Sequence, residues 1–126
     1  MEKFPTNEGE SNLEKVTEEA LISLAKERPL KDPVVEKMLI QWLEDTRISE
    51  RERENVPSVN LVEVAIKHSV MKYRLGFLSK DEVMLELEQA GGCLASERID
   101  TKKQHAELSQ IMYDIEDGVI DVVAHK

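Results

Sequence analysis

The stretch from Ser58 to Phe77 constrains the fold most, because it is largely apolar on two sides. At the roughly 100° turn per residue of an α-helix, its apolar residues fall on nearly opposite faces. One face holds Val59, Val62, Ile66, Val70 and Tyr73, and the other holds Leu61, Val64, His68, Met71 and Leu75. A surface helix needs only one apolar face, whereas a helix that is apolar nearly all round is buried. The sequence therefore predicts a central helix over 58–77 with neighbouring helices on both sides.

Capping residues and apolar spacing predict the helices that precede the central helix, and also the residue at which the central helix starts. A first helix is expected to begin after Ser11 or Asn12 and to end before Pro29, with Ile22 pointing away from its apolar face. Asp32 and Pro33 suit the start of a second helix, whose apolar face Ile40 widens. Ser49 and Glu52 fit a short capping box in the charged linker 47–57. Ser58 is the expected N-cap of the central helix.

The central helix is expected to end at Gly76, which suits the left-handed position after a helix. Ser79 and Glu82 form a second capping box, and the helix that they start is predicted to break at the glycine pair 91–92. The segment 93–100 fits either one or two helical turns or a loop.

A last helix is predicted from Thr101, which could form a capping box with Gln104. Its apolar face continues across Gly118 to Val123, so helix is preferred there, although Gly118 could bend or end it.

Chain length and composition favour one domain. With 126 residues the chain suits a single compact bundle of about five helices over 12–126, preceded by a polar tail, 1–11, that is predicted to be disordered. Cys93 is the single cysteine, so no internal disulfide can form, and a buried structural role is the default expectation. Without a secretory leader or a long apolar run, the chain is predicted to be a soluble cytoplasmic protein that neither spans nor binds a membrane.

The charge balance bears on the partner. The chain has 26 acidic and 17 basic residues and a net charge of −9. An acidic chain is poorly suited to bind phosphate backbones or anionic lipid surfaces. The same charge gives solubility and would attract a protein with a basic surface.

Motifs that would indicate an enzyme or a cofactor are missing from the sequence. There is no phosphate-binding glycine loop, nucleophile elbow, zinc-protease motif or calcium loop. No histidine has a glutamate three residues before it, which counts against a di-metal carboxylate site. No catalytic residue, cofactor or bound metal is therefore predicted. His68 is interpreted as a histidine at the core boundary with a satisfied N–H, and the alternative is a buried group that senses pH.

Two acidic clusters are the candidate contacts for a partner. Asp114, Asp117, Asp121 and His125 would share one flank of a continuous last helix. Three further carboxylates, Glu50, Glu52 and Glu54, lie in the charged linker. A solvated acidic face is the competing interpretation of the first cluster, and a divalent-cation site is a third.

We therefore predict a non-enzymatic protein-interaction module, such as a regulator, adaptor or inhibitor, whose acidic surface binds a basic protein. One alternative is a DNA-binding regulator resembling a helix-turn-helix, using Arg98, Lys102 and Lys103. Another is an inhibitor that mimics nucleic acid, and an enzyme or metal protein is a third class. Because the central helix has two apolar faces to cover, a homodimer is also possible.

Overall fold

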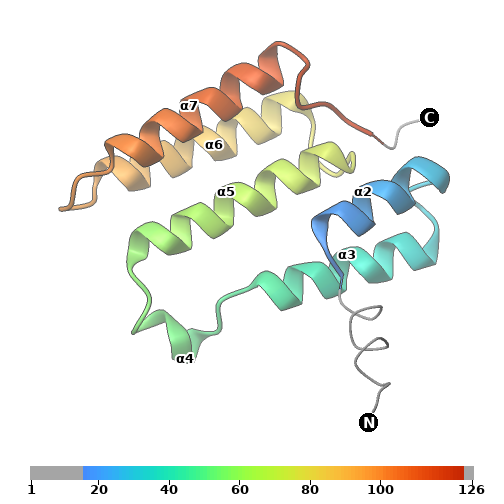
Figure 1. Ribbon diagram of the computed structural model, residues 1–126, viewed down its shortest axis with the longest axis horizontal. Helices are drawn as coiled ribbons and strands as arrows, with labels where there is room; N and C mark the ends of the chain where they lie inside the picture. Colours follow the sequence, from blue (N-terminus) through green and yellow to red (C-terminus); the bar gives the residue numbers. More distant parts are fainter. Residues whose placement is uncertain (1–15, 124–126) are drawn as a thin grey trace, which may run out of the picture.

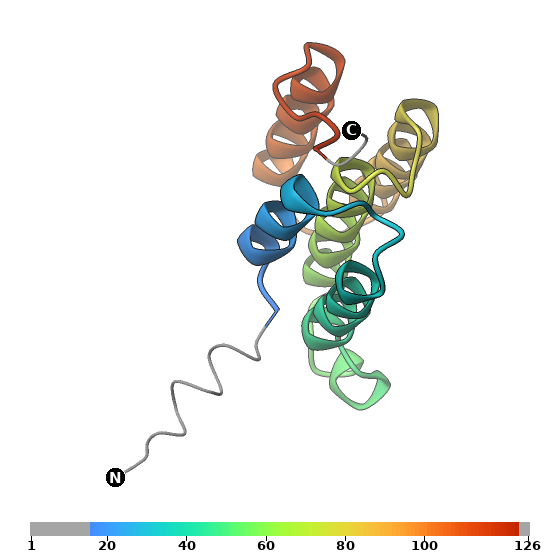
Figure 2. The ribbon, with the colours of Figure 1, turned by 90° about the vertical axis from the view of Figure 1, so that its right-hand side faces the viewer.

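Helix α5 (Ser58–Arg74) runs through the middle of the computed structural model, with other helices on both sides of it (Figure 1). The view turned by 90° shows the same central position (Figure 2). The structure describes residues 16–123, which form helices and no strands. On one side of α5 are α2 (Glu18–Glu27) and α3 (Pro33–Thr46), on the other are α6 (Lys80–Ala95) and α7 (Lys102–Glu116), and the single-turn α4 (Glu50–Arg53) joins α3 to α5. The predicted all-α fold of about five helices is confirmed.

Three sequence predictions concern residues outside the described range: the tail 1–11, the helix start at Ser11 or Asn12, and His125. In the described part, α2 begins at Glu18 and is capped by Thr17, whose Oγ1 accepts a hydrogen bond from the Ala20 N–H at 3.0 Å. The helix ends at Glu27, before Pro29, as predicted.

Helix α5 separates two hydrophobic clusters and contributes to both. The first consists of buried residues from the N-terminal half and α5: Val16, Leu21, Ala25, Leu39, Trp42, Met71 and Leu75. The second joins α5 to α6 and α7: Val59, Ile66, Tyr73, Val83, Leu87, Leu94, Leu108 and Ile115. Burial of one large aliphatic side chain stabilises a fold by about 1.5–3 kcal/mol, so both faces of α5 contribute strongly. In the first half of α5, by contrast, Leu61 and Val64 are only half-buried.

The C-terminus of α5 is closed by Gly76, as the sequence predicted. Gly76 has a φ of +86°, its N–H donates to the Tyr73 carbonyl at 3.0 Å, and the Phe77 N–H donates to the Lys72 carbonyl at 2.8 Å. These two bonds satisfy carbonyls that a helix end leaves without partners. The Phe77 side chain remains 44% exposed.

Three of the predicted caps are confirmed, and two are wrong. Asp32 caps α3, and full capping boxes start α4 at Ser49 and α6 at Ser79. Ser58 is instead the first residue of α5, after Pro57, and its hydroxyl lies 2.7 and 2.8 Å from the two carboxylate oxygens of Glu97.

Thr101 precedes α7, but its hydroxyl donates to the Leu94 carbonyl at 3.4 Å and does not cap the helix. Asp100 supplies the oxygen instead, and its Oδ1 accepts from the Lys102 N–H at 3.0 Å.

The contrast between Ser79, which caps a helix, and Ser58, which does not, gives a first prediction. Replacing Ser79 with Ala should lower the free energy of unfolding by about 1 kcal/mol, because a side-chain cap of a helix is lost. Replacing Ser58 with Ala should cost less than about 0.5 kcal/mol, because only an exposed side-chain hydrogen bond is lost. Urea unfolding of both variants measures the difference. Equal losses would mean that Ser58 contributes as much as a helix cap.

The predicted break at Gly91 and Gly92 is wrong, because α6 runs through both glycines to Ala95. Each glycine costs a helix about 1 kcal/mol relative to alanine. Burial of Leu87 before the pair and Leu94 after it outweighs this cost. An added Cβ at Gly91 would lie 3.3 Å from Cδ2 of Leu108, so the glycine lets α7 approach closely. The segment left open by the sequence is helical from Cys93 to Ala95 and a loop after that.

The preferred helix beyond Gly118 is also wrong. Helix α7 ends at Glu116, and Gly118 has a φ of +82°. The segment 117–123 then turns back toward the end of α5, where the Val123 N–H donates to the Arg74 carbonyl at 2.8 Å. Its apolar side chains connect the two clusters, because Ile120 and Val122 join the second and Val123 joins the first.

Two smaller expectations about single side chains are corrected. Ile22, expected to point outward, is half-buried against the first cluster. Ile40, expected to widen the apolar face of α3, is 54% exposed because that face is already covered through Val35, Leu39 and Trp42. None of the helices in the described part of the chain combines the length and the apolar character needed to cross a membrane.

Candidate functional site

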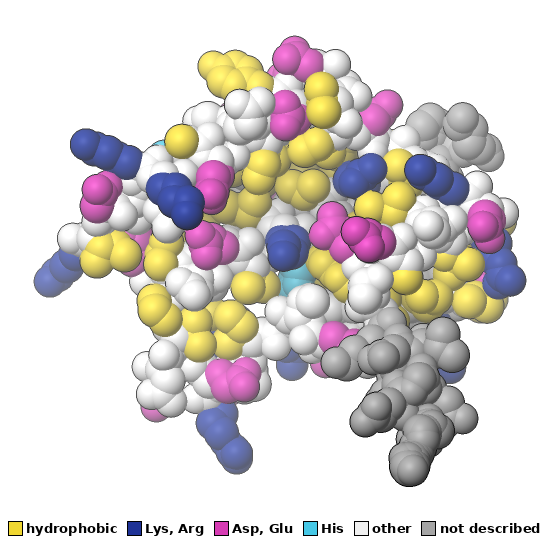
Figure 3. Space-filling view, viewed as in Figure 1, with side chains coloured by type: hydrophobic (Ala, Val, Ile, Leu, Met, Phe, Trp, Pro, Cys, Tyr) yellow, Lys and Arg dark blue, Asp and Glu magenta, His cyan; other side chains and the backbone are white. Residues whose placement is uncertain are grey.

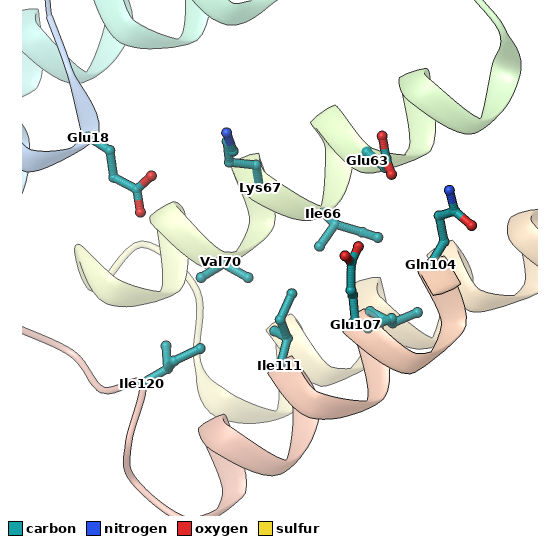
Figure 4. A pocket seen from close by; sticks show the side chains of 10 residues that line it. Glu18, Glu63, Ile66, Lys67, Val70, Gln104, Glu107, Ile111 and Ile120 are labelled. Carbon is teal, nitrogen blue, oxygen red and sulfur yellow. The ribbon is translucent and has the colours of Figure 1, made fainter. Parts of the chain in front are cut away.

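An open apolar groove lies between α5 and α7 and reaches the first turn of α2 (Figure 4). Its volume is about 430 Å³, which is within the usual range for binding sites. The apolar lining comes from α5, α7 and the returning C-terminal segment: Ile66, Val70, Leu108, Ile111 and Ile120. The space-filling view shows hydrophobic side chains gathered in the hollow below α7, with charged side chains around them (Figure 3).

Three helices place carboxylates on the rim of this groove. Glu18 comes from the first turn of α2, Glu63 from the polar side of α5, and Glu107 from α7 (Figure 4). Lys67 is the one basic residue in the lining. The rim therefore carries an excess of negative charge around an apolar floor.

Gln104 also lines the groove. Its Oε1 atom is buried and has no hydrogen-bond partner within residues 16–123. Buried carbonyl oxygens nearly always accept a hydrogen bond. Because it is buried, however, this oxygen is not open to a ligand there, and the groove itself offers an apolar floor and an acidic rim.

The predicted acidic flank of the last helix is not one helical face. Asp114 lies in α7, where its Oδ1 accepts from Nε2 of Gln110 at 2.9 Å. Asp117 is the C-terminal cap residue of α7, and Asp121 lies in the returning segment, where its Oδ1 accepts from the Val122 N–H at 2.7 Å. The three aspartates do not share a face because the predicted spacing required a continuous helix, and the helix ends before Gly118.

The returning segment instead places Asp121 near Tyr73. Burial, Asp121 and Glu116 together raise the pKa of the Tyr73 hydroxyl above its ordinary value of 10.0.

The second predicted cluster surrounds α4 and is exposed. Glu52 is engaged in the capping box of that helix, where its Oε1 accepts from the Ser49 N–H at 3.3 Å. Glu50 and Glu54 lie at the two ends of the helix. Figures 1 and 2 place α4 at the opposite end of the molecule from the last turn of α7, so the structure does not bring the two predicted clusters together.

The groove carboxylates were missed because they come from three separate helices. Sequence spacing indicates which residues share one helix face, but not which faces of different helices meet. Glu63 lies outside the two apolar faces of the central helix, and this was the one indication in the sequence that it is exposed.

His68 lies at the boundary of the first cluster, as predicted, and its Nε2 has a partner. The Thr46 hydroxyl donates to the Trp42 carbonyl at 2.7 Å, which uses its one hydrogen. The 2.6 Å contact between Thr46 Oγ1 and His68 Nε2 therefore requires the histidine to donate. The Trp42 and His68 rings lie 5.0 Å apart between centroids. Burial, Lys72 and Lys67 together lower the pKa of His68 below 6.5.

This lowered pKa predicts a stability loss in mild acid. As the pH falls through 6.5, the unfolded chain takes up a proton at His68 before the folded protein does. The contribution of His68 is therefore complete above that pH and is lost as the pH falls toward the folded-state pKa. Urea unfolding between about pH 7.5 and about pH 5.5 should show a steeper loss for the wild type than for His68→Gln. Parallel pH profiles would contradict the prediction.

Cys93, expected to be buried, is exposed. Because α6 continues through the glycine pair, Leu87 and Leu94 fall on its inner face and Cys93 does not. Within residues 16–123, no three histidine, cysteine or acidic side chains lie close enough together to hold a metal ion.

No protein-family model matches the chain, and neither the curated proteins nor the solved structures compared with it give a match.

Proposed function

We propose that the protein is a non-enzymatic interaction module that binds a basic partner protein in the groove between α5 and α7. The observation that carries the proposal is an apolar floor enclosed by carboxylates from three helices. An amphipathic helix with Lys or Arg beside its apolar face matches this arrangement, because helix-in-groove recognition combines apolar anchors with complementary flanking charge.

One further feature supports a basic helical partner. The net charge of −9 attracts a positively charged protein at long range and accelerates encounter at low salt. The partner would thus supply apolar anchors and positive charge.

A labelled model peptide of about 18 residues, built from Leu and Lys with one apolar face, provides the probe. Fluorescence anisotropy should show saturable binding that weakens as the ionic strength rises. A peptide of the same composition with its apolar face scrambled should bind at least about tenfold more weakly.

Three double variants with equal charge changes locate the site. Glu63→Lys with Glu107→Lys alters the groove and should raise the Kd by at least about tenfold. Two control pairs should change it by less than about threefold, because they lie outside the groove. These are Glu50→Lys with Glu54→Lys at α4, and Asp117→Lys with Asp121→Lys after α7.

The same variants test the sites predicted from sequence. Loss of binding in a control pair but not in the groove pair would place the partner at one of the predicted acidic clusters. Equal losses of affinity in all three pairs would mean that only the net charge of the protein matters. If neither peptide binds, the proposal is overturned. A homodimer stays a prediction, which light scattering at several concentrations tests.

A further inference from the structure

A second hollow lies at the end of the molecule that carries α4, away from the groove described above. It has a volume of about 410 Å³ and is enclosed by the end of α3, by α4 and by the first half of α5. An adjoining hollow of about 550 Å³ shares Ile48, Val64 and His68 with it, and shares Glu63 and Lys67 with the groove.

Four apolar residues around the two hollows belong to neither core cluster, whereas Leu43, which also lines the first of them, packs against the first cluster. Ile48, Val56, Leu61 and Val64 are half-buried, and none of them packs into the two clusters that hold the fold together. Apolar surface left on a concave site of this size, with a few polar groups, is typical of a small-molecule site.

The lining of the hollow has more basic than acidic side chains, although the exposed Glu50, Glu52 and Glu54 lie on and beside α4. Arg47 and Arg53 line it, with Glu44 as the one carboxylate. Within residues 16–123 the salt bridges join Arg28 to Asp32 and Lys80 to Glu116, so neither guanidinium of the hollow is in an ion pair there. A guanidinium binds a carboxylate through two parallel hydrogen bonds, which favours planar acids over other anions.

His68 forms part of the wall and is held in place. Its Nε2 is bonded to Thr46 Oγ1 at 2.6 Å, and its ring lies against Trp42. His68, which lines both hollows, is therefore already ordered, and this lowers the entropic cost when a ligand binds.

We propose that this hollow binds a small organic acid, with its carboxylate at Arg47 and Arg53 and its apolar body against Leu61 and Val64. The site shares no lining residue with the partner-binding groove, and its test does not depend on that proposal. Size and charge together define the ligand class: a carboxylic acid with a short aliphatic or a single aromatic body.

The probes are phenylacetate, indole-3-acetate and hexanoate, each compared with its neutral amide. Nitrogen–proton correlation NMR of the full chain should show saturable shifts for at least one acid, confined to the end of α3, α4 and the first half of α5. The matching amide should bind at least about tenfold more weakly, because it lacks the charge that the guanidinium groups recognise.

A double variant in the hollow and a single variant outside it complete the test. Arg47→Gln with Arg53→Gln should raise the Kd for the acid by at least about tenfold. Arg51→Gln should leave it unchanged, because Arg51 is exposed on α4 and does not line the hollow. Absence of saturable shifts with all three acids, equal binding of acid and amide, or an equal loss in Arg51→Gln would each overturn the proposal.

Discussion

Replacing Leu87 with Ala is expected to lower the free energy of unfolding by about 3 kcal/mol. Leu87 is fully buried in α6, inside the cluster that joins α5, α6 and α7. Truncation removes apolar contacts and leaves a cavity, and helices packed on several sides cannot close in to fill it. Chemical unfolding monitored by circular dichroism measures the loss.

Leu85 is the matched control, because it lies two residues away in the same helix and is 56% exposed. Leu85→Ala should change the free energy of unfolding by less than about 0.5 kcal/mol. Comparable losses for the two variants would contradict the assignment of Leu87 to the core.

Met71→Ala extends this prediction to the other side of α5. Met71 is fully buried in the cluster with α2 and α3, and its truncation should cost about 2–5 kcal/mol. Since α5 contributes to both clusters, each variant should still unfold in one transition. Two separate transitions would show that the clusters are independent units.

The double role of α5 could be predicted from sequence because it depends on spacing within one helix. Val59, Ile66 and Tyr73 recur on one side, Met71 and Leu75 on the other, and the structure covers each side with a different helix pair. Helix ends with strong local signals were also predictable, as at Asp32, Ser79 and Gly76.

The predictions from sequence were wrong where contacts between different helices determine the structure. Gly91 and Gly92 favour a break locally, yet α6 continues because the flanking leucines are buried and α7 approaches Gly91. Ser58 has the right residue type for a cap, but its hydroxyl donates instead to the carboxylate of Glu97, 39 residues away. A local preference of about 1 kcal/mol is outweighed by the burial of large aliphatic side chains, which stabilises the fold by more than that.

The candidate groove was less predictable than the fold for the same reason. Its carboxylates lie at Glu18, Glu63 and Glu107, far apart in sequence, and meet only because α2, α5 and α7 pack around one hollow. The predicted cluster at Asp114, Asp117 and Asp121 depended on a helix that Gly118 ends. A single-sequence pattern therefore predicted the acidic character of the surface but not where the acids converge.

Gly76 gives the second large predicted effect, and Gly118 is its natural control. Both glycines follow a helix end at nearly the same angle, with φ of +86° and +82°. In this left-handed region a Cβ costs about 1–2 kcal/mol. An added Cβ at Gly76 would also lie 2.8 Å from Cδ1 of Leu30, whereas one at Gly118 would have no neighbour within 4 Å. Gly76→Ala should therefore lower the free energy of unfolding by about 2–3 kcal/mol and Gly118→Ala by about 1 kcal/mol.

The difference between these variants reports on how tightly the chain packs at the end of α5. Leu30, from the α2–α3 connection, and Val122, from the returning segment, both approach Gly76, and the Val123 N–H bonds to the nearby Arg74 carbonyl. If the contact with Leu30 adds to the cost, Gly76→Ala should be less harmful in a Leu30→Ala background, and a double-mutant cycle measures that coupling. Equal costs for the two glycines, with no coupling to Leu30, would mean that the leucine moves aside freely. Coupling would show that Leu30, and with it the α2–α3 connection, packs tightly against the C-terminus of α5.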